Sequence, residues 1–150
     1  MKPFKAMLAG VGLLATLVAA APFSASPSPP AGFWLNPHGS VEVAIAPCAR
    51  AQICGTIVWA SAEAQQDARE SGVGNLIGTR LLRDYGPTGA GGWQGQVYVP
   101  DMGRSFFSRI TQVDPQHLRI SGCVLHGLIC KSQTWLRTNQ ALPMPSRTKA

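Results

Sequence analysis

The side chains that could carry out catalysis are few and scattered. The chain has three histidines: His38 in a predicted turn, His117 shortly after an Asp-Pro pair, and His126 between the last two cysteines. Catalysis needs a nucleophile or base that a partner orients at hydrogen-bond distance. No Gly-x-Ser-x-Gly elbow, His-Glu-x-x-His motif or suggestive pair of carboxylates occurs. We therefore expect no enzyme activity and no cofactor, unless His117 or His126 meets an aspartate in a cleft.

Four cysteines form two local pairs, Cys48 with Cys54 and Cys123 with Cys130. In an exported chain such a set predicts disulfides, and local pairing is the simplest of the three connectivities that four cysteines allow. A zinc site that recruits His126 is one alternative, but neither spacing matches that of common structural zinc ligands. A redox-active pair would normally read C-x-x-C, which is absent. We expect two structural disulfides and no metal site.

Aromatic side chains are the best candidates for ligand contacts. Trp59, Trp93, Tyr98 and Phe106 fall on predicted strands, and the interior of a small barrel can be filled by side chains or hold one small ligand. Trp93 and Tyr98 flank Gly95 beside a glycine-rich loop, so we expect this pair first at a ligand. Ordinary core packing is the alternative for each aromatic.

Short strands separated by turn signals would position these residues. Val41, Val43 and Ile45 alternate with other residues at the period of a half-buried strand. Only residues 61–71 are typical of a helix, which is short and lacks a long apolar face. The pattern predicts an all-β barrel or sandwich. We expect about eight strands, at 32–36, 40–46, 53–60, 75–85, 93–99, 104–113, 117–125 and 129–138.

The N-terminus has the three parts of a secretory signal peptide. Lys2 and Lys5 precede an uncharged apolar run from Met7 to Ala20, and small residues follow it. The run is too short for a membrane-spanning helix, which needs about 20 residues. We expect a periplasmic or secreted protein without a transmembrane span. Its expected parts are a signal peptide over 1–20, a disordered Ser/Pro-rich leader over 21–31, a domain over 32–138 and a flexible tail over 139–150.

The charge pattern argues against a nucleic-acid partner. The formal net charge is +6, and loss of Lys2 and Lys5 with the signal peptide leaves +4. The basic residues are scattered singly, whereas nucleic-acid-binding proteins show a basic stripe or a known motif. Such a mild charge fits solubility and weak attraction to anionic surfaces.

Taken together, the spaced motifs resemble a family of short exported bacterial proteins, domain-of-unknown-function family 2147 (DUF2147). The resemblance covers nearly all of the expected domain. The chain departs from the family over 60–74, where an Ala/Gln-rich segment replaces an acidic, asparagine-containing loop. The shared motifs are GxW at 32–34, GSxEV at 39–43, CGTIVW at 54–59, WxGxVYxPxxG at 93–103 and CKSQTWxR at 130–137.

The resemblance implies an exported, lipocalin-like β-barrel and no established reaction. In lipocalins an arginine after the last strand lies across the tryptophan of the first strand and closes the barrel floor; Trp34 and Arg137 occupy these positions. Our leading hypothesis is a binding protein for a small apolar or amphipathic ligand. The alternative is a filled barrel that meets a protein or peptidoglycan partner in the cell envelope, and an envelope enzyme ranks third.

Overall fold

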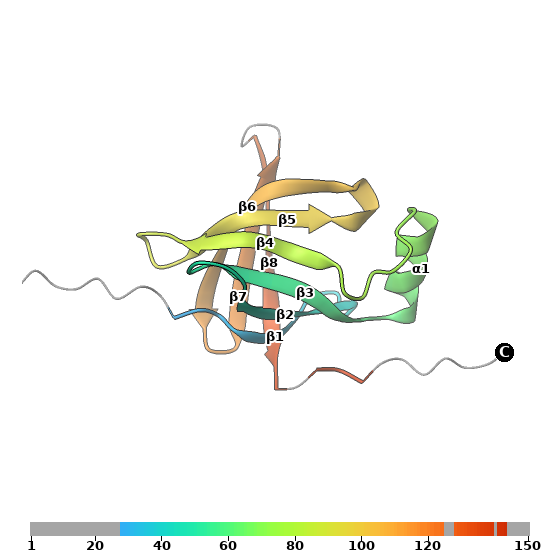
Figure 1. The fold of residues 1–150 in the computed structure, drawn as a ribbon, viewed down its shortest axis with the longest axis horizontal. Coiled ribbons are helices and arrows are strands. Elements are labelled where there is room, and N and C mark those ends of the chain that lie inside the picture. The colour runs from blue at the N-terminus through green and yellow to red at the C-terminus, as the bar shows by residue number, and fades with distance from the viewer. Residues whose placement is uncertain (1–27, 125–127, 140, 144–150) are drawn as a thin grey trace, which may run out of the picture.

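The computed structural model describes residues 28–124, 128–139 and 141–143 (Figure 1). The predicted signal peptide and His126 lie outside the described residues, as do most of the leader and the end of the tail. Over the described ranges, no helix combines the length and the hydropathy needed to cross a membrane.

Eight antiparallel strands close into a barrel, which confirms the predicted all-β fold with one short helix (Figure 1). Each strand pairs with the next along the chain, and β8 pairs with β1. Helix α1 contacts η1 at one end of the barrel, which we call the mouth. The elements are β1 (Gly32–Leu35), β2 (Val41–Pro47), β3 (Ile53–Ala60), α1 (Ala62–Glu70), β4 (Arg80–Pro87), β5 (Trp93–Val99), η1 (Pro100–Met102), β6 (Arg104–Asp114), β7 (His117–Val124) and β8 (Ile129–Thr138).

The predicted strand at 75–85 was wrong at its start, because β4 begins only at Arg80. Gly78 has a φ of +88°, which breaks an extended path. The apolar residues that suggested a strand have another role: Leu76 is buried and Ile77 packs against the core. These residues cover the barrel instead of joining its wall.

The middle of the barrel is filled by side chains from facing strands. Tyr85 is fully buried, and its hydroxyl is hydrogen bonded to the Ser108 hydroxyl. Burial raises the pKa of Tyr85 to about 12, so the phenol stays neutral. Gly95 makes room for this ring, since a Cβ there would lie 2.8 Å from two of its atoms. The glycine between Trp93 and Tyr98 therefore serves core packing.

Arg137 closes the opposite end, which we call the floor. Its guanidinium lies over the indole of Trp34, 4.2 Å from the ring centroid, so the expected contact is present. Its side chain also donates to the carbonyls of Pro115, at 2.7 Å, and Ala31, at 2.8 Å. Gly32 is required beside it, because φ is +123° and a Cβ would lie 2.6 Å from Arg137 Nη1. Arg137 thus joins β8, the N-terminal segment and the β6–β7 turn.

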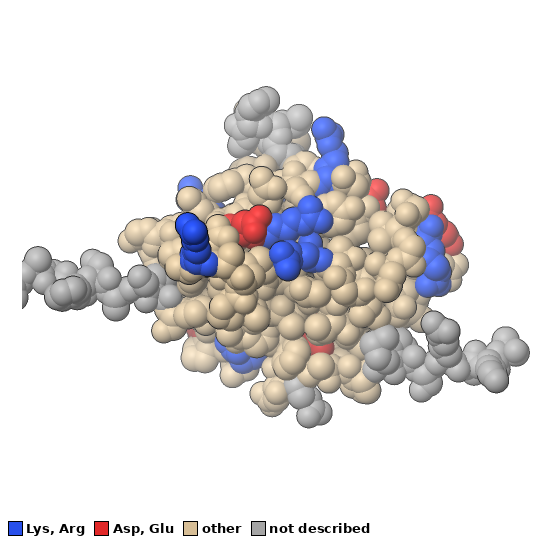
Figure 2. All heavy atoms as spheres, in the orientation of Figure 1, with Lys and Arg blue, Asp and Glu red and all other residues tan. Residues whose placement is uncertain are grey.

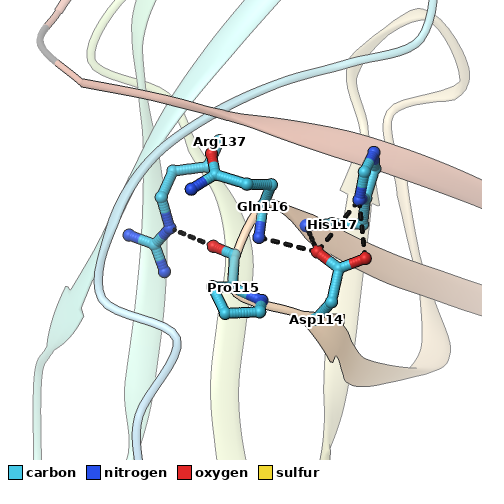
Figure 3. Close-up of polar contacts among 5 residues, drawn as sticks. All are labelled: Asp114, Pro115, Gln116, His117 and Arg137. Atoms are coloured by element: carbon cyan, nitrogen blue, oxygen red, sulfur yellow. Dashed lines mark hydrogen bonds and ion pairs between the residues drawn. The ribbon is translucent and has the colours of Figure 1, made fainter.

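The β6–β7 turn presents the Pro115 carbonyl to Arg137 (Figure 3). Asp114 Oδ1 accepts the backbone N–H groups of Gln116, at 2.7 Å, and His117, at 2.8 Å. The His117 ring contacts the same carboxylate through Nδ1, at 2.8 Å from Oδ2 (Figure 3). Asp114 therefore holds the turn in the shape that Arg137 needs.

Residues within the two segments that we expected to be disordered or flexible, 21–31 and 139–150, contact the barrel. Pro30 is fully buried, and its carbonyl accepts the Trp34 indole N–H at 2.9 Å. Glu42 is fully buried, and residues near the C-terminal end of the chain contact it. Its carboxylate accepts the Thr138 hydroxyl at 2.5 Å and the Leu142 N–H at 2.8 Å. Polar groups that the barrel buries near its wall thus find partners in the flanking segments.

Replacing Arg137 by methionine removes the cation over Trp34 and two hydrogen bonds while keeping an apolar stem. We expect Arg137→Met to lower the free energy of unfolding by about 2–3 kcal/mol in urea denaturation. Arg119→Met is the matched control, because Arg119 is exposed and its side chain has no hydrogen-bond, ion-pair or ring partner among the described residues. Equal stability of the two variants would contradict a closing role for Arg137.

The Asp114 turn should make stability depend on pH. Backbone hydrogen bonding from Gln116, with a smaller contribution from His117, holds the pKa of Asp114 below its ordinary value. The stabilisation is therefore present above the ordinary aspartate pKa and is lost as pH falls through the lowered one. In thermal melts between about pH 6 and pH 2, the advantage of the wild type over Asp114→Asn should shrink on acidification. The exposed Asp84→Asn change is the control, and a constant advantage would refute the prediction.

The hydrogen bond from Leu142 should contribute to stability through its backbone alone. Leu142→Pro removes the N–H and leaves a buried carboxylate oxygen of Glu42 without that donor, which should cost about 1–3 kcal/mol. Leu142→Ala keeps the N–H and should be much milder. If denaturation curves show the same loss for both variants, the contact is not the cause.

Candidate functional site

A hollow lies at the mouth, between α1, η1 and the ends of the barrel strands. Its volume is about 470 Å³, which is within the range of sites for small molecules. Apolar side chains form most of its wall, and polar side chains come from the β1–β2 turn, α1, η1 and β8. It is lined by Asn36, His38, Ser40, Val41, Ile57, Ala64, Asp67, Ala68, Leu76, Leu81, Val97, Tyr98, Val99, Pro100, Asp101, Gln133 and Trp135.

Two features allow helix α1 to cover this cavity. Its caps stabilise the helix, and its small residues face the cavity. The Ser61 side chain accepts the Ala64 N–H at 3.1 Å, which caps the first turn. Glu63 in the first turn and Arg69 in the last turn both suit the helix dipole. Ala64 and Ala68 are four residues apart, so they share one face, and both line the cavity. Their short side chains leave the space beneath the helix open.

Trp135 is the tryptophan of the cavity wall. It is 5% exposed, and its indole N–H donates to Gln133 Oε1 at 3.1 Å. The two residues lie on the same face of β8, and both line the cavity. This arrangement satisfies the polar atom of the indole, so the ring presents apolar surface to the hollow.

The polar groups of the cavity fall into two kinds. Asn36 is committed to its own turn, since its side-chain oxygen accepts the backbone N–H groups of Ser40, at 2.8 Å, and Val41, at 3.1 Å. Asp67 on α1 and Asp101 on η1 line the cavity as exposed residues. Neither carboxylate has a hydrogen-bond or ion-pair partner among the described residues. Asp67 and Asp101 are therefore available to a ligand.

The four aromatic residues that we expected at a ligand do not come together. Tyr98 lines the cavity, with the Arg83 guanidinium 4.2 Å from its ring centroid. Trp93 sits at the other end of β5, beside two smaller hollows of about 320 and 270 Å³. Trp59 points outward and donates to the Pro143 carbonyl at 2.7 Å. Phe106 is half-buried opposite Val97 and is not part of the cavity lining.

A β-bulge explains why Trp59 is outside. Val43 pairs with Ile57, but the preceding Glu42 pairs with Trp59, so β3 has one extra residue there. An extra residue moves every later side chain to the opposite face of the sheet. Ile57 therefore lines the cavity and Trp59 does not.

Sequence reasoning did not select Trp135, Gln133 or the two alanines of α1 as ligand contacts. Alternation along the last strand could have placed Gln133 and Trp135 on one face. The spacing of Ala64 and Ala68 could have shown one small-residue face of the helix. Neither signal shows which part of the molecule each face contacts, because that depends on how the barrel closes.

His117 does meet an aspartate, Asp114, in the β6–β7 turn, and Asp114 lines the hollow of about 320 Å³ beside Trp93; neither residue lines the mouth cavity. Both side chains are about half exposed, at 46% for His117 and 47% for Asp114. Over the described ranges, no group of three or more His, Cys, Asp or Glu side chains could hold a metal ion. The two disulfides join Cys48 to Cys54 and Cys123 to Cys130, which confirms the expected connectivity.

Comparison with solved structures shows the fold. The chain is similar to the Helicobacter pylori protein HP1028, which is described as belonging to the lipocalin family. The TM-score is 0.54 at 14% sequence identity, over 73% of this chain and 82% of that chain. No curated protein matches the sequence.

The comparison with protein families gives a match that extends from the first strand of the barrel to the last. Residues 32–137 match the profile of a family described as an uncharacterized protein conserved in bacteria, DUF2147. This range runs from Gly32, beside Arg137, to Arg137 itself, so the match begins and ends at the contact that closes the floor. The chain belongs to the DUF2147 family.

Proposed function

We propose that this protein is an exported, lipocalin-like binding protein that holds a small apolar or amphipathic molecule in the mouth cavity. The cavity itself is the observation that carries the proposal: about 470 Å³ with a mostly apolar wall and a few polar groups. Ligand sites commonly have this character. The fold supports the proposal, because eight-stranded barrels can hold one small ligand.

Export is supported by the cysteines and by the N-terminal sequence. All four cysteines are in disulfides, and such bonds persist in oxidising compartments. The first 20 residues read as a signal peptide. We therefore place the protein in the periplasm or outside the cell.

We propose binding and not catalysis as the role of the cavity. Its titratable side chains are His38, Asp67 and Asp101, with Tyr98 at its edge. None of these is hydrogen bonded to another, whereas a catalytic base needs an orienting partner. The alternative of an envelope partner protein assumed a filled barrel, and the hollow mouth favours a ligand instead.

Filling the space beneath α1 should block binding. We expect saturable binding of the neutral fluorescent probe N-phenyl-1-naphthylamine by the wild type. Ala64→Phe places a large ring in the cavity and should weaken binding by about tenfold or more, since it removes buried contact area. Ala62→Phe is the matched control on the same helix, at an exposed position outside the lining.

Two outcomes of this titration would count against the proposal. The first is the absence of saturable binding to the wild type. The second is an equal loss of affinity in Ala64→Phe and Ala62→Phe, which would place the probe elsewhere on the molecule. Circular dichroism of each variant should show the same β-sheet spectrum, which separates loss of binding from loss of fold.

A further inference from the structure

The charge of the mouth cavity narrows the class of ligand. We infer that the cavity selects amphipathic cations, with the apolar part of the ligand inside the barrel and its positive head between Asp67 and Asp101. This inference rests on the proposed binding function. It adds the sign of the ligand's charge, which the fold alone does not specify.

The first argument is the inventory of charges in the lining. Among the described residues that line the cavity, Asp67 and Asp101 are the only acidic ones, and none is a lysine or an arginine. The lining also contains His38. An anionic head group would meet two carboxylates at the mouth and no arginine or lysine to pair with. A cationic head group would meet both carboxylates.

The second argument is that these two lining carboxylates are free, unlike those of Glu42 and Asp114. The Glu42 carboxylate accepts two hydrogen bonds from the C-terminal region, and Asp114 caps its turn. Asp67 and Asp101 accept none from the described residues. They come from α1 and η1, two elements in contact with each other, so both can approach one head group.

The third argument concerns an arginine that contacts a residue of the lining. Arg83 lies over the ring of Tyr98, but it is not part of the lining. Its Nε donates to the Arg80 carbonyl at 3.1 Å, and its Nη1 donates to Ser105 Oγ at 3.3 Å. Arg83 is therefore engaged on the barrel wall and forms no ion pair with Asp67 or Asp101.

The charge of the residues at the mouth is negative, whereas the net charge of the whole chain is positive. The formal net charge is +6, and Figure 2 shows blue side chains spread over the barrel wall. The same view shows red side chains both on the barrel wall and on the α1 side, and α1 itself contains Glu63, Asp67 and Glu70 against Arg69 alone. A cation is therefore drawn to the mouth by local charge and not by the overall charge.

The preference of the cavity for a cation over an anion should be moderate, because Asp67 and Asp101 are exposed. A unit charge about 4 Å away in high dielectric changes affinity by roughly fivefold, and salt weakens the effect. With two carboxylates, we expect a cation to bind at least about tenfold more tightly than an anion of the same chain length at low salt.

Three ligands with one chain length test the inference: decyltrimethylammonium, decanoate and 1-decanol, each kept below its aggregation concentration. Binding is read by displacement of N-phenyl-1-naphthylamine and by the fluorescence change that Trp135→Phe removes. The wild type should prefer decyltrimethylammonium to decanoate by about tenfold, with a smaller preference at about 0.5 M salt.

The double variant Asp67→Asn/Asp101→Asn should lose this preference and still bind 1-decanol as the wild type does. Glu63→Gln is the matched control: it removes one acid from the same helix outside the lining, and the preference should remain. Retained decanol binding shows that the cavity of the double variant is intact.

The outcomes separate the two proposals. If 1-decanol binds but the cation and the anion bind equally, or if the double variant keeps the preference, the inference is overturned and the proposed binding function stands. If neither the probe nor any of the three ligands binds the wild type, the proposed function fails, and the inference fails with it.

Discussion

The contact between Arg137 and Trp34 is the interaction on which the rest of this barrel depends. A closed sheet must join its last strand to its first, and the β8–β1 pairing is short, with only three residues of β1 in register. The guanidinium reinforces this seam from the side: it covers the indole and binds carbonyls of the N-terminal segment and the β6–β7 turn. Arginine suits the position because a planar cation can stack and donate in several directions at once.

Closure at the floor gives the two ends of the barrel different properties. Trp34 and Tyr85 are fully buried, and their rings occupy the floor and the middle. At the mouth, the chain covers the barrel with a helix that presents alanines inward, and a cavity is left beneath it. The helix lies within the segment 60–74, where the sequence departs from the family pattern.

The acids of this protein illustrate how similar side chains acquire different roles. Glu42 is buried, and its carboxylate accepts two hydrogen bonds from the C-terminal region. Its role is therefore to hold the C-terminal segment against the barrel. Asp114 shapes a turn, and its carboxylate supports the floor through Pro115. The carboxylates of Asp67 and Asp101 have no hydrogen-bond partner among the described residues, and both residues line the cavity. What separates these roles is the number of donors that surround each carboxylate.

Much of this architecture was determined by the sequence alone. Alternating apolar residues, turn signals and paired cysteines predicted eight antiparallel strands, one short helix and both disulfides, because these depend on local periodicity and spacing. The resemblance to lipocalins pointed to Trp34 and Arg137. What the sequence could not determine was which side chains face the cavity. A bulge at Val58 turns Trp59 outward, and a second bulge in β4 turns Tyr85 inward, where it needs Gly95. One extra residue in a strand reverses every later side chain, and only the pairing with neighbouring strands decides where that residue goes.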